Sequence, residues 1–162
     1  MAANAGKAYR RLKPWVLPAA LLAALAPVNA KQTFTSTQAL AFGRFVAGTG
    51  GTITVAPNGA RSRTGGVVLL TSTATAASFT NSDNSAKNAS ATVAITLPAN
   101  GSVVLSSGAN QMAVNAFTSS PSGTGVMSGG SLTILVGATL TVGANQPKGN
   151  YSGSIPVTIN YQ

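Results

Sequence analysis

The sequence has no cysteine and no histidine, and among its 162 residues the single acidic side chain is that of Asp83. Without cysteine there are no disulfides, so stability must come from core packing or from assembly with other chains. General acid–base catalysis normally needs a histidine or a pair of carboxylates, and protein zinc sites need cysteine or histidine. We therefore expect a protein that is not an enzyme and that holds no metal and no cofactor.

Charged residues are also scarce, at 7% of the chain against about a quarter in ordinary soluble domains. The polar surface must instead be supplied by Ser, Thr, Asn and Gly. Because little charge repulsion opposes the meeting of strand edges, this composition favours lateral association between chains. Such surfaces are typical of secreted fibres, coats and pilus subunits, and they indicate a structural or adhesive role.

The first 30 residues have the three-part layout of a secretory signal peptide. Four basic residues precede an apolar stretch, Trp15 to Val28, and small residues end at Ala30. The rival interpretation is a membrane anchor, but a spanning helix needs about 20 apolar residues, and this stretch is shorter and contains Pro18 and Pro27. We expect residues 1–30 to direct export to the periplasm, the cell surface or the medium, and we expect no integral membrane segment after cleavage.

The remaining 132 residues, 31–162, suffice for one domain with a buried core. Six basic residues and the single aspartate give this part a net charge of +5. The cations are scattered along the chain and form no stripe that could follow a phosphate backbone, so we expect no nucleic-acid partner. The basic residues are Lys31, Arg44, Arg61, Arg63, Lys87 and Lys148.

After residue 30 the pattern is that of an all-β protein, because short alternating or β-branched runs are separated by Gly, Asn and Pro and no helical periodicity is sustained. Asn-Gly pairs at 58–59 and 100–101 predict two hairpin turns. Two stretches rich in turn-forming residues, 81–90 and 119–130, predict surface loops. The expected strands are Gln38–Val46, Thr52–Ala56, Gly66–Thr71, Ala77–Thr80, Ala91–Leu97, Ser102–Ser106, Gln111–Thr118, Ser131–Val136, Ala138–Val142 and Gly153–Tyr161.

The last expected strand has the clearest alternation. Its apolar residues share one face, which should enter the core, and small or polar residues share the other. A proline at position 156 cannot donate a ladder hydrogen bond, so this strand is expected at an edge or open on one side to a partner. The residues of the apolar face are Tyr151, Ile155, Val157, Ile159 and Tyr161.

Five segments are spread over nearly the whole of 31–162. They are Leu40-Ala41-Phe42-Gly43, 91–98 (ATVAITLP), Met112-Ala113-Val114, 136–140 (VGATL), and 149–161, which begins Gly-Asn-Tyr-Ser-Gly and ends Val-Thr-Ile-Asn-Tyr. In this order they resemble a secreted bacterial family catalogued as a domain of unknown function. That family is in turn similar in pattern to spore-coat-protein-U-like and chaperone-usher pilus subunits.

The resemblance implies an immunoglobulin-like, pilin-like β-sandwich in a fimbrial-type subunit of the cell envelope. Its N-terminal strand would contain Phe34, Leu40 and Phe42. The alternating apolar residues of the last strand would match those that a periplasmic chaperone covers by adding a strand, and Tyr161 would match the penultimate tyrosine of such subunits. The implied partners are copies of the chain or related subunits, and a periplasmic chaperone.

Two hypotheses for function come from the sequence. The first is a structural or adhesive subunit of a cell-envelope appendage, coat or fimbria-like assembly, joined by strand addition at the last strand. The second is a self-contained secreted binding module that attaches to an envelope glycan, lipid or protein through its loops. A strand position that only another chain can fill would favour the first, and a complete core would favour the second.

Overall fold

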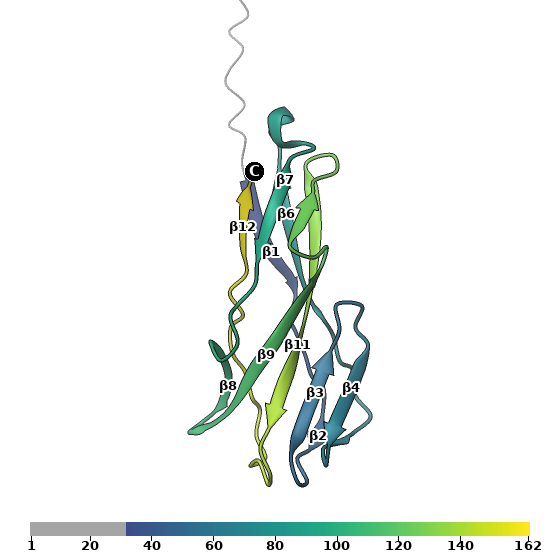
Figure 1. Cartoon of the computed structure of the whole chain (residues 1–162), viewed down its shortest axis with the longest axis vertical. Helices are drawn as coiled ribbons and strands as arrows, with labels where there is room; N and C mark the ends of the chain where they lie inside the picture. Colours follow the sequence, from purple (N-terminus) through teal and green to yellow (C-terminus); the bar gives the residue numbers. More distant parts are fainter. Residues whose placement is uncertain (1–31) are drawn as a thin grey trace, which may run out of the picture.

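The protein is all-β in the computed structural model, which describes residues 32–162 (Figure 1). The signal peptide expected over 1–30 lies outside the described residues. Within them, no helix combines the length and the apolar character needed to cross a membrane. The elements are β1 Gln32–Gln38, β2 Phe45–Val46, β3 Gly51–Val55, β4 Arg61–Gly65, β5 Val68–Leu69, β6 Ala77–Asp83, the 3-10 helix η1 Ala86–Asn88, β7 Thr92–Thr96, β8 Val103–Ser107, β9 Asn110–Ser120, β10 Thr124–Val126, β11 Ser131–Val142 and β12 Thr158–Tyr161.

The longest strand, β11, organises the largest sheet and runs through much of the length of the molecule (Figure 1). β9 pairs along one side of β11, while β6 and then β3 pair along the other. β1 and β4 continue the sheet outward from β6 and β3, so both are edge strands. β6 gives way to β3 at Gly137, where an added Cβ would collide with the carbonyl oxygen of Val55. A residue without a side chain is therefore required at the point where β3 replaces β6 as the neighbour of β11.

Two smaller sheets complete the fold. One has the order β10-β7-β12, and the other pairs β2 with β5. An isolated bridge between Ala41 and Thr75 extends the β2–β5 pairing, so the segments 41–46 and 68–75 run together as an antiparallel pair. We call this pair of segments the β2–β5 ribbon.

The buried apolar residues form two clusters. The first joins β3, β9 and β11 to the β2–β5 ribbon and includes Ile53, Val114 and Leu140. The second joins β6 and β11 of the large sheet to β7 of the three-stranded sheet and includes Phe79 and Ile95. β11 contributes to both clusters, because its inward-facing residues alternate along almost its whole length.

The all-β prediction is confirmed, but several predicted boundaries are wrong. The N-terminal strand covers 32–38 instead of 38–46, and 39–44 contains only the bridge at Ala41. The expected strands 131–136 and 138–142 are one strand, because the ladder continues past Gly137. Only 158–161 of the expected last strand is in a ladder. β4 and β10 lie where the sequence pattern predicts no strand, since neither has an apolar run.

One of the two predicted hairpins is correct. The Asn58-Gly59 turn joins β3 to β4, and Asn58 Oδ1 accepts a hydrogen bond from the Ala60 N–H at 3.0 Å. A turn also forms at 99–102, but β7 and β8 belong to different sheets, so the hairpin predicted there is wrong. The two predicted loops are shorter than expected, because β6 continues to Asp83 and the stretch 119–130 contains the end of β9 and all of β10.

Candidate functional site

The C-terminal segment, 151–161, runs along both apolar clusters. Tyr151, Ile155, Val157, Ile159 and Tyr161 are partly buried, and the residues between them are exposed. Tyr151 and Ile155 pack against the first cluster, whereas Val157 and Ile159 pack against the second. The residues predicted for one assembly strand are therefore divided between two clusters, and only those in β12 have a ladder partner in the fold.

β12 is an edge strand, and its outer backbone groups face away from its neighbour β7. The Gln162 N–H donates to the Thr92 carbonyl oxygen at 2.9 Å. Since hydrogen-bonded and non-hydrogen-bonded pairs alternate in an antiparallel ladder, residues 158 and 160 also turn their N–H groups toward β7. The N–H and C=O groups of Ile159 and Tyr161 then point to the side on which the described chain supplies no strand.

β1 is an edge of the large sheet and pairs antiparallel with β6. The Phe34 ring stacks on Phe79 with 5.5 Å between centroids and 7° between ring planes. The other six residues of β1 are exposed. Of the three residues predicted for the N-terminal strand, only Phe34 lies in a strand. Leu40 packs against both clusters, and Phe42 is buried in the first, because the chain leaves the sheet after residue 38.

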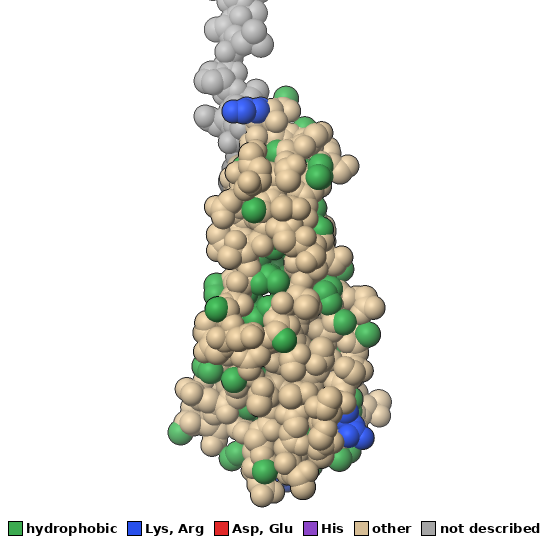
Figure 2. Space-filling model, in the orientation of Figure 1, with side chains coloured by type: hydrophobic (Ala, Val, Ile, Leu, Met, Phe, Trp, Pro, Cys, Tyr) green, Lys and Arg blue, Asp and Glu red, His purple; other side chains and the backbone are tan. Residues whose placement is uncertain are grey.

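Apolar side chains in or next to the two edge strands pack against the same cluster. Phe34, Leu40, Val157 and Ile159 are all only partly buried, and all pack against the second cluster. We call the surface formed by these four residues the β1–β12 side. Figure 2 shows hydrophobic side chains in a hollow at mid-height of the molecule, just below the level of β12 in Figure 1. Because they are only partly buried, the four residues of the β1–β12 side keep some apolar area in contact with water.

A buried amide holds the end of β12 in place. Asn81 of β6 is 0% exposed, and its Nδ2 donates to the Tyr161 hydroxyl at 2.9 Å and to Met127 Sδ at 3.3 Å. The Asn81 Oδ1 is buried and has no hydrogen-bond partner among the described residues. Because unsatisfied buried polar atoms are costly, the bond to Tyr161 is the principal compensation for burying this amide.

The only acidic side chain, Asp83, terminates β6 and is 5% exposed. Asn88 Nδ2 donates to its Oδ2 and the Ser85 N–H donates to its Oδ1, both at 2.8 Å. The hydrogen bond from Asn88, followed by that from Ser85, lowers the pKa of Asp83 below its ordinary value, and the Tyr161 hydroxyl acts weakly in the same direction while burial opposes them. The carboxylate therefore stabilises the structure that follows β6.

The opposite edge of the large sheet is protected by charge. On β4, Arg61 lies opposite Val55 and Arg63 lies opposite Ile53. Val55 and Ile53 are 0% exposed, so both arginines lie on the core-facing side of the strand. Inward-pointing charges keep a further strand from joining an edge. β1 and β12 contain no charged residue, so they are edges at which pairing is unopposed.

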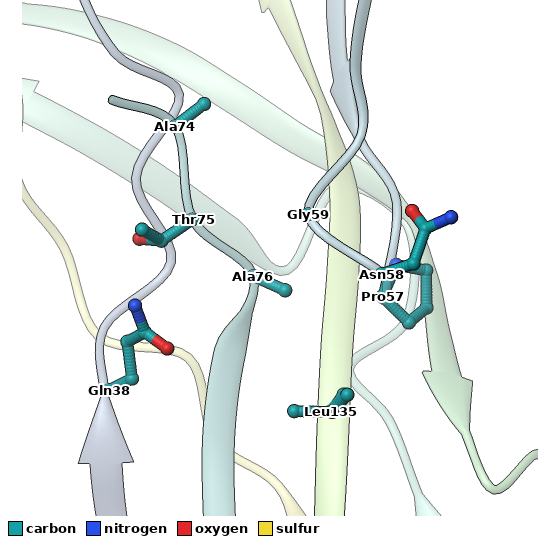
Figure 3. A pocket seen from close by; sticks show the side chains of 8 residues that line it. All are labelled: Gln38, Pro57, Asn58, Gly59, Ala74, Thr75, Ala76 and Leu135. Carbon is teal, nitrogen blue, oxygen red and sulfur yellow. The ribbon is translucent and has the colours of Figure 1, made fainter. Parts of the chain in front are cut away.

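A separate cavity of about 270 Å³ opens where β6 gives way to β3. Figure 3 shows Gln38 and Thr75 on one side of it, the turn at Pro57 and Asn58 on the other, and Leu135 below. Its polar side chains are amides and a hydroxyl, and no residue that lines it is acidic or basic. The cavity therefore offers neutral hydrogen-bonding groups without an acid or base for a reaction.

The family known as DUF4402, described as a domain of unknown function, matches residues 33–161. The chain belongs to this family. The DUF4402 match includes β12 and all of β1 except Gln32, so the two edges belong to the domain itself. No curated protein and no solved structure matches the chain. The predicted membership of a domain-of-unknown-function family is confirmed, and the link to pilus and spore-coat subunits stays a prediction.

Sequence reasoning missed the roles of several residues in this DUF4402 domain. Arg61 and Arg63 lie in a polar segment, but the turn at 58–59 and the length of β3 require a partner strand of equal length, whatever its composition. Asn81 and Asp83 lie in a stretch that resembles a loop. They nevertheless continue the period-two pattern of β6, in which every second residue is buried. Strand periodicity extended through polar residues was the signal that could have found them.

Proposed function

We propose that this DUF4402 domain is a structural or adhesive subunit of an exported cell-envelope assembly, such as a coat or a fimbria-like fibre. Its copies would join by strand addition at the β1–β12 side. The large sheet and the three-stranded sheet would be the two layers of an immunoglobulin-like, pilin-like sandwich. One observation carries the proposal: two uncharged edge strands flank an apolar cluster that the chain's own residues leave partly exposed.

An added strand would satisfy both features of the β1–β12 side. The outward N–H and C=O groups of Ile159 and Tyr161 would form its backbone hydrogen bonds. Its alternating apolar side chains would cover Phe34 and Val157. In this mode of recognition the backbone bonds provide affinity and the side-chain contacts provide specificity. Copies joined in this way contact each other head to tail, which produces an open filament when the rotation does not close a ring.

The proposed partners are copies of the chain or related subunits. A periplasmic chaperone would cover the β1–β12 side until assembly, since an exposed apolar edge in an unassembled subunit favours aggregation. The chain contains no cysteine, so no disulfide can lock such an assembly. Its persistence would rest on hydrogen bonding and apolar burial between subunits.

The test is an unboiled SDS gel of envelope fractions, immunoblotted for the protein. Kinetically trapped strand addition should give a ladder that collapses to monomer on boiling. In one variant, Ile155, Val157 and Ile159 are replaced by Ser, which removes apolar area from the C-terminal segment. In a second variant, Thr158→Lys and Asn160→Lys place charges on exposed positions of β12 and leave its packing residues unchanged. We expect both variants to lose the ladder while they are still exported.

The matched control is Ser62→Lys with Thr64→Lys. It adds the same two charges to exposed positions of β4, an edge that already has two arginines, and it should keep the ladder. A ladder that persists in the β12 lysine variant would refute strand addition at this edge. A single monomer band for native protein and all variants would refute the subunit proposal and favour the self-contained binding module.

A further inference from the structure

The outer face of the β2–β5 ribbon bears a compact apolar patch. Val46 and Val68 are a cross-strand pair, so their side chains lie on one face, and each is 52% exposed. Leu70, two residues after Val68, lies on the same face and is 38% exposed. The large apolar residues exposed elsewhere in the described chain are Val104 and Val126, which lie in different sheets. The ribbon is thus the one place where the described residues gather exposed aliphatic side chains on a single face.

Positive charge accompanies this patch. Arg44 is exposed, and it lies on the patch face, because it precedes Val46 by two residues and its carbonyl oxygen accepts from the Leu70 N–H at 3.0 Å. Arg61 reaches the ribbon from β4, where its guanidinium donates to the Arg44 carbonyl oxygen, so two of the five basic residues in 32–162 lie at the ribbon. Figure 2 shows blue atoms beside green ones at the lower right, where Figure 1 draws β4 and β2.

The guanidinium of Arg61 fixes the backbone that carries the patch. Its Nη2 donates to the Arg44 carbonyl oxygen at 2.8 Å, and its Nη1 donates to Ser72 Oγ at 3.2 Å. A two-stranded sheet alone is marginally stable in water. This side chain ties the ribbon to β4 and holds the aliphatic residues outward in a defined arrangement, which lowers the entropic cost of binding to a surface.

We propose that the ribbon face docks on the surface of a lipid leaflet that contains anionic headgroups. Val46, Val68 and Leu70 would enter the boundary between headgroups and acyl chains, while Arg44 would contact the phosphates. Anionic lipid is the occupant that matches both features, since exposed aliphatic area and cationic rim are the combination that interfacial membrane binding uses.

The charge also argues against a second copy as the occupant. Two identical ribbon faces would bring arginines against arginines, and the single aspartate lies in β6, outside the patch. This inference is independent of strand addition, because the ribbon and the β1–β12 side consist of different residues. The two contacts together would orient an assembled subunit on a membrane.

The test is co-sedimentation of the protein, purified from envelope fractions, with vesicles of phosphatidylcholine alone or with phosphatidylglycerol. We expect binding to the phosphatidylglycerol vesicles that salt weakens. Arg44→Gln should reduce the affinity about fivefold, because one arginine near an anionic surface contributes roughly that much. Val46→Ser with Val68→Ser should reduce it about tenfold through lost apolar insertion. The native protein and all variants begin at the same residue, so only the differences in vesicle affinity between them are interpreted.

The matched control is Val104→Ser with Val126→Ser, which removes the same side chains at exposed positions outside the ribbon and should bind like the native protein. Thermal melts followed by circular dichroism establish that each variant is folded. Equal binding by native protein and ribbon variants, or no binding by the native protein, overturns the proposal. A loss in the arginine variant without a loss in the valine variant also overturns it, because the ribbon would then recognise polyanions in general.

Discussion

Replacing Tyr161 by phenylalanine removes one hydroxyl from the end of β12 and leaves its ring in place. The hydroxyl accepts a hydrogen bond from Asn81 Nδ2 at 2.9 Å, and Asn81 is 0% exposed. After Tyr161→Phe, this buried amide keeps only the weak sulfur acceptor of Met127, and its Oδ1 already has no partner among the described residues. The change therefore tests how firmly the fold holds the strand at the proposed assembly edge.

The expected loss of stability follows from the cost of removing one partner of a buried hydrogen bond while the other partner stays buried. An unsatisfied buried donor costs about 1–3 kcal/mol, so Tyr161→Phe should lower the free energy of unfolding by that amount. The midpoint of thermal unfolding should fall by about 3–5 °C for each kcal/mol lost. Urea denaturation followed by circular dichroism measures the loss directly.

The matched control is Tyr151→Phe in the same C-terminal segment. The Tyr151 hydroxyl donates to the Pro147 carbonyl oxygen at 2.8 Å and accepts from Gln146 Nε2 at 2.9 Å. Water can reach these partners, so this substitution should cost only about 0.5 kcal/mol. Equal losses at Tyr161 and Tyr151 would show that burial of the amide has no special role.

A double-mutant cycle isolates the pair. Asn81→Leu combined with Tyr161→Phe removes both hydrogen-bonding partners, and such paired removal costs less than leaving one partner unsatisfied. The two single losses should therefore exceed the double loss by about 1 kcal/mol or more. If the two single losses sum to the double loss within about 0.3 kcal/mol, a stabilising hydrogen bond between Asn81 of β6 and Tyr161 of β12 is refuted.

Two further outcomes are expected from the same fold. Gly137→Ala should lower the free energy of unfolding by about 3 kcal/mol, because the new Cβ meets the backbone of Val55. Gly59→Ala, at φ +81 with open space around it, should lower it by about 1 kcal/mol. Urea denaturation compares the two variants, and equal losses would contradict the steric argument. The pKa of Asp83 is lowered on folding, so its contribution to stability is present above the unfolded value of about 3.8 and is lost as pH falls through the folded value. Thermal midpoints between pH 2 and 7 should therefore fall in acid for the native protein and much less for Asp83→Asn, and parallel curves would exclude Asp83 as the source.

The sequence by itself determined the all-β class and the residue types that are missing. Period-two alternation and turn residues are local signals, and they identified β3, β7, β8 and most of β9 and β11 because these strands bury apolar residues on one face. The lack of cysteine and histidine supports the expectation that the protein has no usual catalytic or metal site, and that expectation stays a prediction. The same alternation correctly assigned Ile155, Val157 and Ile159 to the core-facing side of the C-terminal segment.

Only the tertiary structure decided which edges are open. Strand pairing depends on contacts between residues far apart in sequence, so no local pattern could show that β1 pairs with β6 or that β7 and β8 belong to different sheets. The polar strand β4 forms because its hairpin partner supplies the ladder, and only that pairing reveals that its arginines point inward. Likewise, asparagine is a residue type typical of loops. The role of Asn81 is visible only in the fold, where the hydroxyl of Tyr161, 80 residues later, accepts a hydrogen bond from its amide.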